Sequence, residues 1–195
     1  MKAKSSPPTA LVTGAAGYIG SVLVPALLAE GYGVIALDDF LYGQATLLDC
    51  CHDPCLRIVR GDARDEALLK RLCAESDALI PLACLVGAPI CARRPVEARS
   101  INLDAIETLL QVSRDDQPVI FPNTNSGYGI GAPGVPCTEA SPLNPVSLYG
   151  RLKVEAERRV LASGRGVSLR LATVFGVSPR MRLDLLVNDF TYRAV

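Results

Sequence analysis

Short apolar runs rich in β-branched residues alternate along the chain with longer stretches in which apolar residues recur at helical spacing. This alternation predicts βαβ units that build a parallel sheet. Several of the apolar runs contain almost no polar residue, as expected for strands that helices cover on both faces. The expected fold class is therefore α/β, with a doubly wound parallel sheet. The expected strands are Ala10–Thr13, Gly33–Leu37, Leu56–Val59, Ala78–Leu82, Val119–Pro122 and Val167–Leu171.

The amphipathic stretches predict four helices, at Tyr18–Glu30, Glu66–Glu75, Val96–Ser113 and Leu148–Ala162. Pro25 lies inside the first helix and has no amide to donate, so a kink is expected there. Residues 176–195 read as a loop followed by the start of another helix. Since a sheet of this class usually continues, the chain is expected to be the amino-terminal portion of a longer protein.

Composition and charge narrow the possible functions. The chain has 195 residues, of which 49% are hydrophobic and 21% charged, values typical of one globular domain. Twenty basic and 20 acidic residues cancel, and no basic stripe indicates binding to nucleic acid. No apolar run has the length of a membrane span, and the first residues lack the apolar core of a signal peptide. A soluble, cytoplasmic protein is expected.

The seven cysteines are expected to be reduced thiols, because their number is odd and no secretion signal is seen. Cys50, Cys51, His52 and Cys55 form a compact cluster that has the residue types of a zinc site. Structural zinc sites usually draw ligands from two separated knuckles, and no second knuckle follows. The expectation is a loop or helix end that holds no metal.

Three glycines follow the first expected strand and open the first helix. Gly14, Gly17 and Gly20 stand in the spacing G-x-x-G-x-x-G, with Tyr18 and Ile19 before the last of them. Glycines allow a tight turn and a close approach of a pyrophosphate to the main chain, while the amides at the helix start face the phosphates. Glycines also form plain turns, so the pattern depends on its context.

An acidic residue at the end of the second strand supplies that context. Asp38 follows Gly20 by 18 residues, and a carboxylate there accepts hydrogen bonds from the adenosine ribose and repels a 2′-phosphate. The next residue is Asp39 rather than a basic residue. The predicted cofactor is NAD rather than NADP, the alternative being a surface aspartate that simply ends a strand.

Tyr149 and Lys153 lie four residues apart near the start of a predicted helix, so they project from one face. A free tyrosine has a pKa near 10, and a nearby ammonium group lowers it. Such a phenol accepts the proton of a hydroxyl group that is being oxidised. A short hydroxyl side chain is needed beside it, and both Thr124 and Ser126 follow the fifth strand at the carboxyl edge of the sheet.

Taken together, these motifs resemble the extended short-chain dehydrogenases of the NAD-dependent nucleotide-sugar epimerase and dehydratase family, over essentially the whole chain. The strings TGAAGYIG, GDAR, LACLVG and YGRLK carry the resemblance. It implies a Rossmann fold and a catalytic trio of Thr124, Tyr149 and Lys153. The cofactor contacts that it implies are Gly14, Gly17, Tyr18, Ile19, Gly20, Asp38, Asp39, Asp62, Ala63, Leu82, Ala83, Cys84, Asn102, Tyr149 and Lys153.

The resemblance also implies a reaction, NAD-dependent oxidation at carbon 4 of a GDP- or UDP-linked sugar. The chain is similar to sugar 4-epimerases and to GDP-heptose 4-dehydrogenases. Family 4,6-dehydratases carry an Asp-Glu pair after the threonine, and Asn125 and Ser126 here cannot supply that acid and base. The chain also has Pro81 and Thr173 where many members have His and Asn. The substrate contacts implied are Val86, Ser126, Thr173, Arg182 and Asn188.

The resemblance divides the chain into a flexible start (residues 1–8), an NAD-binding domain (9–178) and the beginning of a nucleotide-sugar binding region (179–195). It implies a homodimer in which the helices Val96–Ser113 and Leu148–Ala162 pair with their symmetry mates. Ile106, Leu109 and Leu110 fit such an interface, and they fit packing on the sheet equally well. A non-catalytic NAD-binding module and an oxidoreductase of a non-sugar alcohol are the alternatives.

Overall fold

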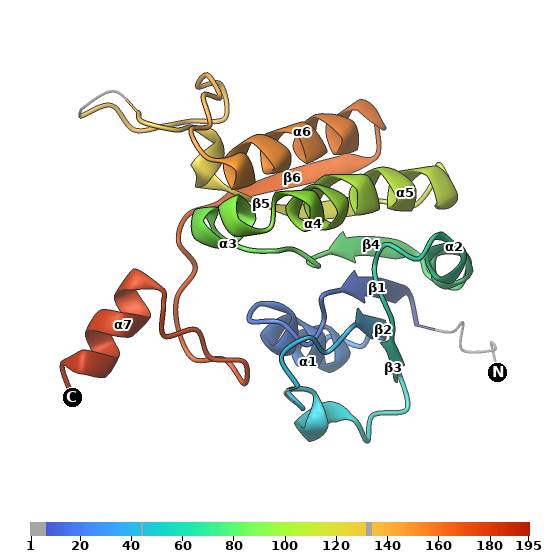
Figure 1. Cartoon of the computed structure of the whole chain (residues 1–195). Helices are drawn as coiled ribbons and strands as arrows, with labels where there is room; N and C mark the ends of the chain where they lie inside the picture. Colours follow the sequence, from blue (N-terminus) through green and yellow to red (C-terminus); the bar gives the residue numbers. More distant parts are fainter. Residues whose placement is uncertain (1–6, 44, 132–133) are drawn as a thin grey trace.

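The computed structural model describes residues 7–43, 45–131 and 134–195 and contains one parallel sheet of six strands in the order β3-β2-β1-β4-β5-β6 (Figure 1). The predicted α/β class with a doubly wound sheet is confirmed. The expected flexible start falls mostly on residues 1–6, which lie outside the described residues. The strands are β1 (Thr9–Thr13), β2 (Gly33–Asp38), β3 (Leu56–Arg60), β4 (Ala78–Pro81), β5 (Val119–Thr124) and β6 (Gly166–Leu171).

Three features of the helices differ from the sequence prediction. The expected helix Val96–Ser113 consists of α4, a π-helical turn at Ser100–Asp104 and α5, and α3 was not expected at all. The first helix starts at Gly20 rather than Tyr18, because the residues before it belong to the glycine turn (residues 14–20), and it runs through Pro25 without a break. The helices are α1 (Gly20–Ala29), α2 (Glu66–Ala74), α3 (Ala88–Arg93), α4 (Pro95–Arg99), α5 (Ala105–Val112), α6 (Leu148–Ala162) and α7 (Leu186–Arg193).

Each face of the sheet has its own apolar core, because successive strand residues point to opposite faces. Leu11 on β1 packs in the core formed with α2, α5 and α6, while its neighbour Val12 packs in the core formed with α1. Figure 1 shows α4, α5 and α6 on one side of the sheet and α1 on the other. On β6 the side chains of Val167 and Leu169 are exposed, so the α1 face is covered less completely there.

The strand order places a crevice at the carboxyl edge of the sheet. β1 and β4 are neighbours, and the chain leaves β1 toward α1 on one face and β4 toward α3 on the other. Ligands of open α/β sheets bind outside the carboxyl ends of the strands at such a switch point.

The residues after β6 lie against the glycine turn. Within this crossing segment (residues 176–188), the Ser178 hydroxyl donates to the Tyr18 carbonyl oxygen (2.8 Å) and contacts the Ser21 hydroxyl (3.0 Å). The Tyr18 hydroxyl donates to the carbonyl oxygen of Gly176 (2.7 Å). The crossing segment is therefore fixed to the turn by both side-chain and main-chain groups.

None of the described helices is both long enough and apolar enough to span a membrane. Cys50 is half-buried, Cys51 and Cys55 are exposed, and the seven cysteines are free thiols. Within the described ranges, no group of three or more His, Cys, Asp and Glu side chains is arranged to hold a metal ion.

Candidate active site

A cavity of about 730 Å³ opens at the carboxyl edge of the sheet, within the size range of small-molecule sites. Its lining comes from the glycine turn, the ends of β2 to β6, the start of α6 and the crossing segment. Most of the site residues expected from the sequence lie there. They are Gly14, Gly17, Tyr18, Ile19, Gly20, Asp38, Asp39, Asp62, Ala63, Leu82, Ala83, Cys84, Val86, Thr124, Ser126, Tyr149, Lys153, Thr173 and Arg182.

The geometry of the glycine turn explains its glycines. Gly14 has φ +69°, and a Cβ there would lie 2.6 Å from the Ala83 amide nitrogen. A Cβ at Gly20 would lie 2.5 Å from the Ala15 carbonyl oxygen, so both positions need glycine for internal packing. Gly17 lines the cavity, and a Cβ there would meet only the Gly14 carbonyl oxygen, at 3.0 Å. The turn thus presents bare main chain at the start of α1, which suits a bound pyrophosphate.

Asp38 lies at the cavity wall, where its carboxylate also organises the surrounding loops. It accepts hydrogen bonds from the amides of Ala16 (2.9 Å) and Phe40 (2.8 Å). Burial raises the pKa of this carboxyl group, although the two amide hydrogen bonds act in the opposite direction. A carboxylate has about four acceptor sites, so capacity is left for ribose hydroxyl groups. Asp39 accepts from the Leu41 amide (2.9 Å) beside it.

The turn that follows β3 contains the GDAR string, with the expected cofactor contacts Asp62 and Ala63. Its Asp62 forms an ion pair with Arg64 (2.5 Å), and hydrogen bonding from this guanidinium lowers the pKa of the carboxyl group. Both side chains are roughly two-fifths exposed, so the pair adds little stability. Its effect is to hold the turn, including Ala63, at the rim of the cavity.

Thr124 and Tyr149 reach the cavity from β5 and α6. Thr124 ends its strand, and its hydroxyl group donates to the Ser126 hydroxyl (3.1 Å). Tyr149 stands in the first turn of α6, which Ser147 caps by accepting a hydrogen bond from the Gly150 amide (3.0 Å). Burial raises the pKa of the Tyr149 phenol, while the nearby Thr124 hydroxyl and the Arg182 guanidinium act in the opposite direction.

Lys153 is directed differently from the sequence expectation. Its ammonium group donates to the Pro122 carbonyl oxygen (2.9 Å) and lies 3.8 Å above the ring of Phe121, and the residue is only 5% exposed. Burial lowers the pKa of this ammonium group. The side chain lines the cavity, but its ammonium group contacts residues of β5. The cation that lowers the pKa of Tyr149 is instead Arg182.

Asn102 and Asn188, expected to touch cofactor and substrate, lie behind the cavity lining. Asn102 holds the loop after β4: its Oδ1 accepts from the Leu85 amide (2.8 Å) and its Nδ2 donates to the Leu85 carbonyl oxygen (3.0 Å). Asn188 donates to the Tyr18 hydroxyl and to the Arg182 carbonyl oxygen, both at 3.0 Å. Because these amide groups are engaged by the protein, both residues position groups that line the cavity.

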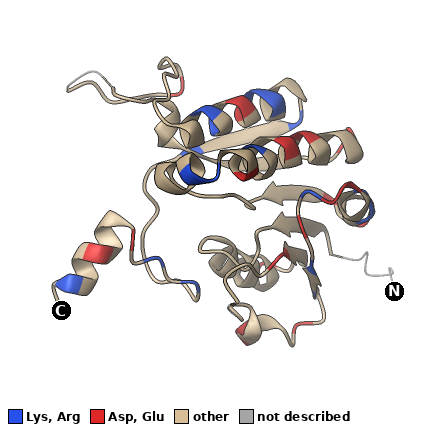
Figure 2. Ribbon diagram, viewed as in Figure 1, with Lys and Arg blue, Asp and Glu red and all other residues tan. Residues whose placement is uncertain are grey.

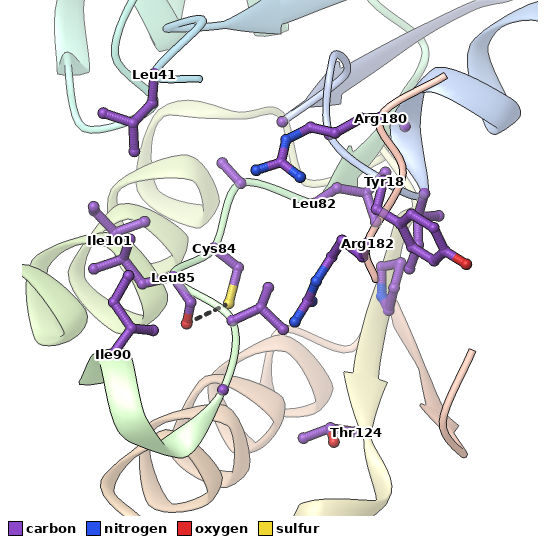
Figure 3. Close-up of a pocket in the computed structure, with 18 of the residues that line it drawn as sticks. Tyr18, Leu41, Leu82, Cys84, Leu85, Ile90, Ile101, Thr124, Arg180 and Arg182 are labelled. Carbon is purple, nitrogen blue, oxygen red and sulfur yellow. Dashed lines mark hydrogen bonds between the residues drawn. The ribbon is translucent and has the colours of Figure 1, made fainter. Parts of the chain in front are cut away.

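Two arginines of the crossing segment enter the cavity, as Figure 3 shows for Arg180 and Arg182. Arg182 is paired with Asp184 (2.5 Å). The Arg180 guanidinium lies 3.7 Å above the ring of Tyr42. The sequence predicts a loop at this position, but the stacking of Arg180 on Tyr42 joins residues far apart in the chain and has no local signal.

A buried charged network behind Thr124 and Tyr149 was also missed. Glu157 lies one turn after Lys153 on α6 and pairs with Arg170 of β6 (2.6 Å). The same carboxylate accepts hydrogen bonds from the Ser168 hydroxyl (2.8 Å) and from the amide of Asn123, the residue before Thr124. The network thereby ties α6 to β5 and β6.

Comparison with known proteins finds one family whose members are similar to this chain in sequence and fold. Residues 10–192 match the model of the NAD dependent epimerase/dehydratase family. The UDP-glucose 4-epimerase of Lactobacillus helveticus is 32% identical over 152 residues, which is 76% of this chain and 44% of that protein. The chain thus spans about half the length of the curated relatives it matches.

Solved structures show the same likeness. The dTDP-glucose 4,6-dehydratase DesIV of Streptomyces venezuelae, solved with NAD and TYD bound, superposes with a TM-score of 0.85 and 31% identity, covering 95% of this chain and 62% of that one. The UDP-glucuronic acid 4-epimerase of Bacillus cereus in complex with NAD gives a TM-score of 0.80 and 27% identity, covering 91% and 60%.

Proposed function

Because the chain belongs to the NAD-dependent epimerase/dehydratase family, we propose that it takes part in NAD-dependent oxidation at carbon 4 of a nucleotide-linked sugar. The observation that carries the proposal is one cavity lined by the glycine turn, Asp38, Thr124 and Tyr149. Relatives named as UDP-glucose and UDP-glucuronic acid 4-epimerases support carbon 4 as the reacting position.

The proposed roles follow from the position of each group. Bound NAD would supply the acceptor for the hydride that leaves carbon 4. The glycine turn would hold the pyrophosphate of the cofactor and Asp38 its adenosine ribose. Thr124 would donate a hydrogen bond to the reacting oxygen, and the Tyr149 phenolate would accept its proton. Val86, Ser126, Thr173 and Arg182 would face the sugar nucleotide, in line with their places in the cavity wall.

Asn125 and Ser126 favour epimerisation or simple oxidation over dehydration. Both residues line the cavity directly after Thr124, but neither an amide nor an alcohol supplies the acid and base needed to remove water from the sugar. If the 4-keto sugar is reduced again from its other face, the outcome is epimerisation. If the keto sugar leaves, it is dehydrogenation.

A homodimer is part of the proposal through the family resemblance. The residues first considered for its interface support packing within one chain instead, since Ile106 is 4% and Leu109 2% exposed in the core beside the sheet. On the outer surface of the same region, Val96 is 81% exposed and available to a partner helix.

Incubation of the purified chain with NAD and a panel of UDP- and GDP-linked sugars tests the proposal. The expected result is NADH absorbance, or a sugar inverted at carbon 4, with at least one nucleotide sugar. Tight NAD binding without any conversion would favour a cofactor-binding module. Oxidation of a lipid or steroid alcohol, with no response to nucleotide sugars, would show that the substrate is a non-sugar alcohol.

A further inference from the structure

Two arginines of the cavity wall, Arg93 and Arg180, have no carboxylate partner among the ion pairs of the described residues, and of the two only Arg180 has a buried guanidinium nitrogen without a hydrogen bond. Its guanidinium stacks on the Tyr42 ring at 3.7 Å, and its Nε is buried without a hydrogen-bond acceptor among those residues. Arg64 and Arg182, which also line the cavity, are bound by Asp62 and Asp184. A buried donor without an acceptor is costly, so an acceptor is expected from a ligand in the cavity.

The backbone of Arg180 is held beside the glycine turn. Its amide donates to the Ser178 hydroxyl (3.2 Å), which in turn donates to the Tyr18 carbonyl oxygen (2.8 Å). The Tyr18 hydroxyl is bonded to Gly176 and receives a hydrogen bond from Asn188 (3.0 Å). These contacts fix the backbone of Arg180 relative to the glycine turn, and the Tyr42 ring holds its guanidinium.

The surroundings of Arg180 belong to the adenosine half of the site. Tyr42 follows Asp38 closely in the chain, and the positive charge of Arg180 contributes to lowering the pKa of Asp38 against the effect of burial. The glycine turn itself, residues 14–20, contains no charged residue. Figure 2 marks basic residues on the segment between β6 and α7, which supplies the positive charge that the turn lacks.

We propose that Arg180 binds the diphosphate bridge of the bound dinucleotide, held over the glycine turn by the Tyr42 ring and the Ser178 hydroxyl. The inference rests on the proposed binding of NAD. A guanidinium offers several donors in one plane, which match the oxygens of a diphosphate. The crossing segment thus contributes to the cofactor site as well as to the substrate region.

Titration calorimetry with Arg180→Met and a series of probes tests the inference. The probes are adenosine, ADP-ribose, NAD and UDP. Loss of a charged hydrogen bond is expected to weaken NAD and ADP-ribose binding about ten- to a hundredfold and to leave adenosine binding unchanged. Arg180→Lys keeps the charge but not the planar set of donors, so its loss of NAD affinity should be smaller than that of Arg180→Met. Arg193→Met, on α7 and paired with Asp189, is the control for the change in net charge.

The outcomes separate this inference from the proposed function. Equal NAD affinity in the wild type and in Arg180→Met would overturn the role of Arg180 and leave NAD binding intact. A loss confined to UDP would assign Arg180 to the diphosphate of the nucleotide sugar and would also overturn it. A wild-type chain that binds neither NAD nor ADP-ribose would refute the proposed function itself. The melting temperature of each variant is compared with that of the wild type to show that the variant is folded. If Arg180→Met unfolds the chain, the comparison is made with Arg180→Lys.

Discussion

Replacing Glu157 with Ala is expected to lower the free energy of unfolding by about 3–5 kcal/mol, the range for breaking a buried ion pair from one side. Glu157 is 2% exposed, and its loss leaves the Arg170 guanidinium and the Asn123 amide without their acceptor. Urea unfolding followed by circular dichroism measures the change. Glu155→Ala, on the same helix, removes a partly exposed carboxylate and should cost less than about 1 kcal/mol.

The acid range gives an independent check on Glu157. Burial acts to raise the pKa of this carboxyl group, but hydrogen bonds from Arg170, Ser168 and Asn123 outweigh it and the net pKa is lowered. A carboxyl group with a lowered folded-state pKa stabilises the protein above its ordinary pKa of 4.5, and the stabilisation disappears as the pH falls through the folded value. The advantage of the wild type over Glu157→Gln should therefore shrink in acid. An equal loss of unfolding free energy in Glu155→Ala and Glu157→Ala would contradict the stabilising role of the Glu157 network.

Replacing Tyr149 with Phe is expected to reduce turnover of a nucleotide sugar about 10²–10⁴-fold, the usual contribution of a general base. The variant removes one hydroxyl group from the cavity wall, and the glycine turn and Asp38 are untouched. NAD affinity should therefore change little. Tyr32→Phe is the matched control, because it removes the same group from an exposed tyrosine just after α1.

The pH dependence of turnover follows from the burial of Tyr149. Burial raises the pKa of the phenol, and the phenolate is the form that accepts a proton. Turnover should rise with pH in the range below that pKa, and this rise should be absent in Tyr149→Phe. A variant that keeps the wild-type rate and pH profile would show that another group removes the proton.

The strands and long helices could be predicted because they bury continuous faces that leave a pattern in the sequence. The π-helical turn at Ser100–Asp104 keeps the apolar spacing of the helix around it, so the sequence showed one helix where the structure has three segments. α3 was missed because it has only six residues and a proline in its first turn. Both features shape the loop that Asn102 holds at the cavity wall.

The site could be predicted where its residues stand in local motifs. Gly14, Asp38 and Tyr149 each follow a strand or open a helix, and the topology alone brings them to one edge of the sheet. The direction of Lys153 toward Pro122 could not be predicted, because it depends on the space left under β5.

The long-range side-chain pairs could not be predicted from the sequence for a related reason. Arg180 meets Tyr42, and Glu157 meets Arg170, only once the crossing segment and the sheet are in place. Charged residues at such positions look like any solvated charge when the sequence is read locally. Their function becomes visible through burial and partners, which are properties of the fold.

Calorimetric titration of NAD and NADP into the purified chain tests the central claim most directly. The arrangement of the glycine turn and Asp38 predicts saturable binding of one NAD per chain, with NADP at least about tenfold weaker because the carboxylate repels a 2′-phosphate. Absence of saturable NAD binding, or equal affinity for NADP, would contradict the account.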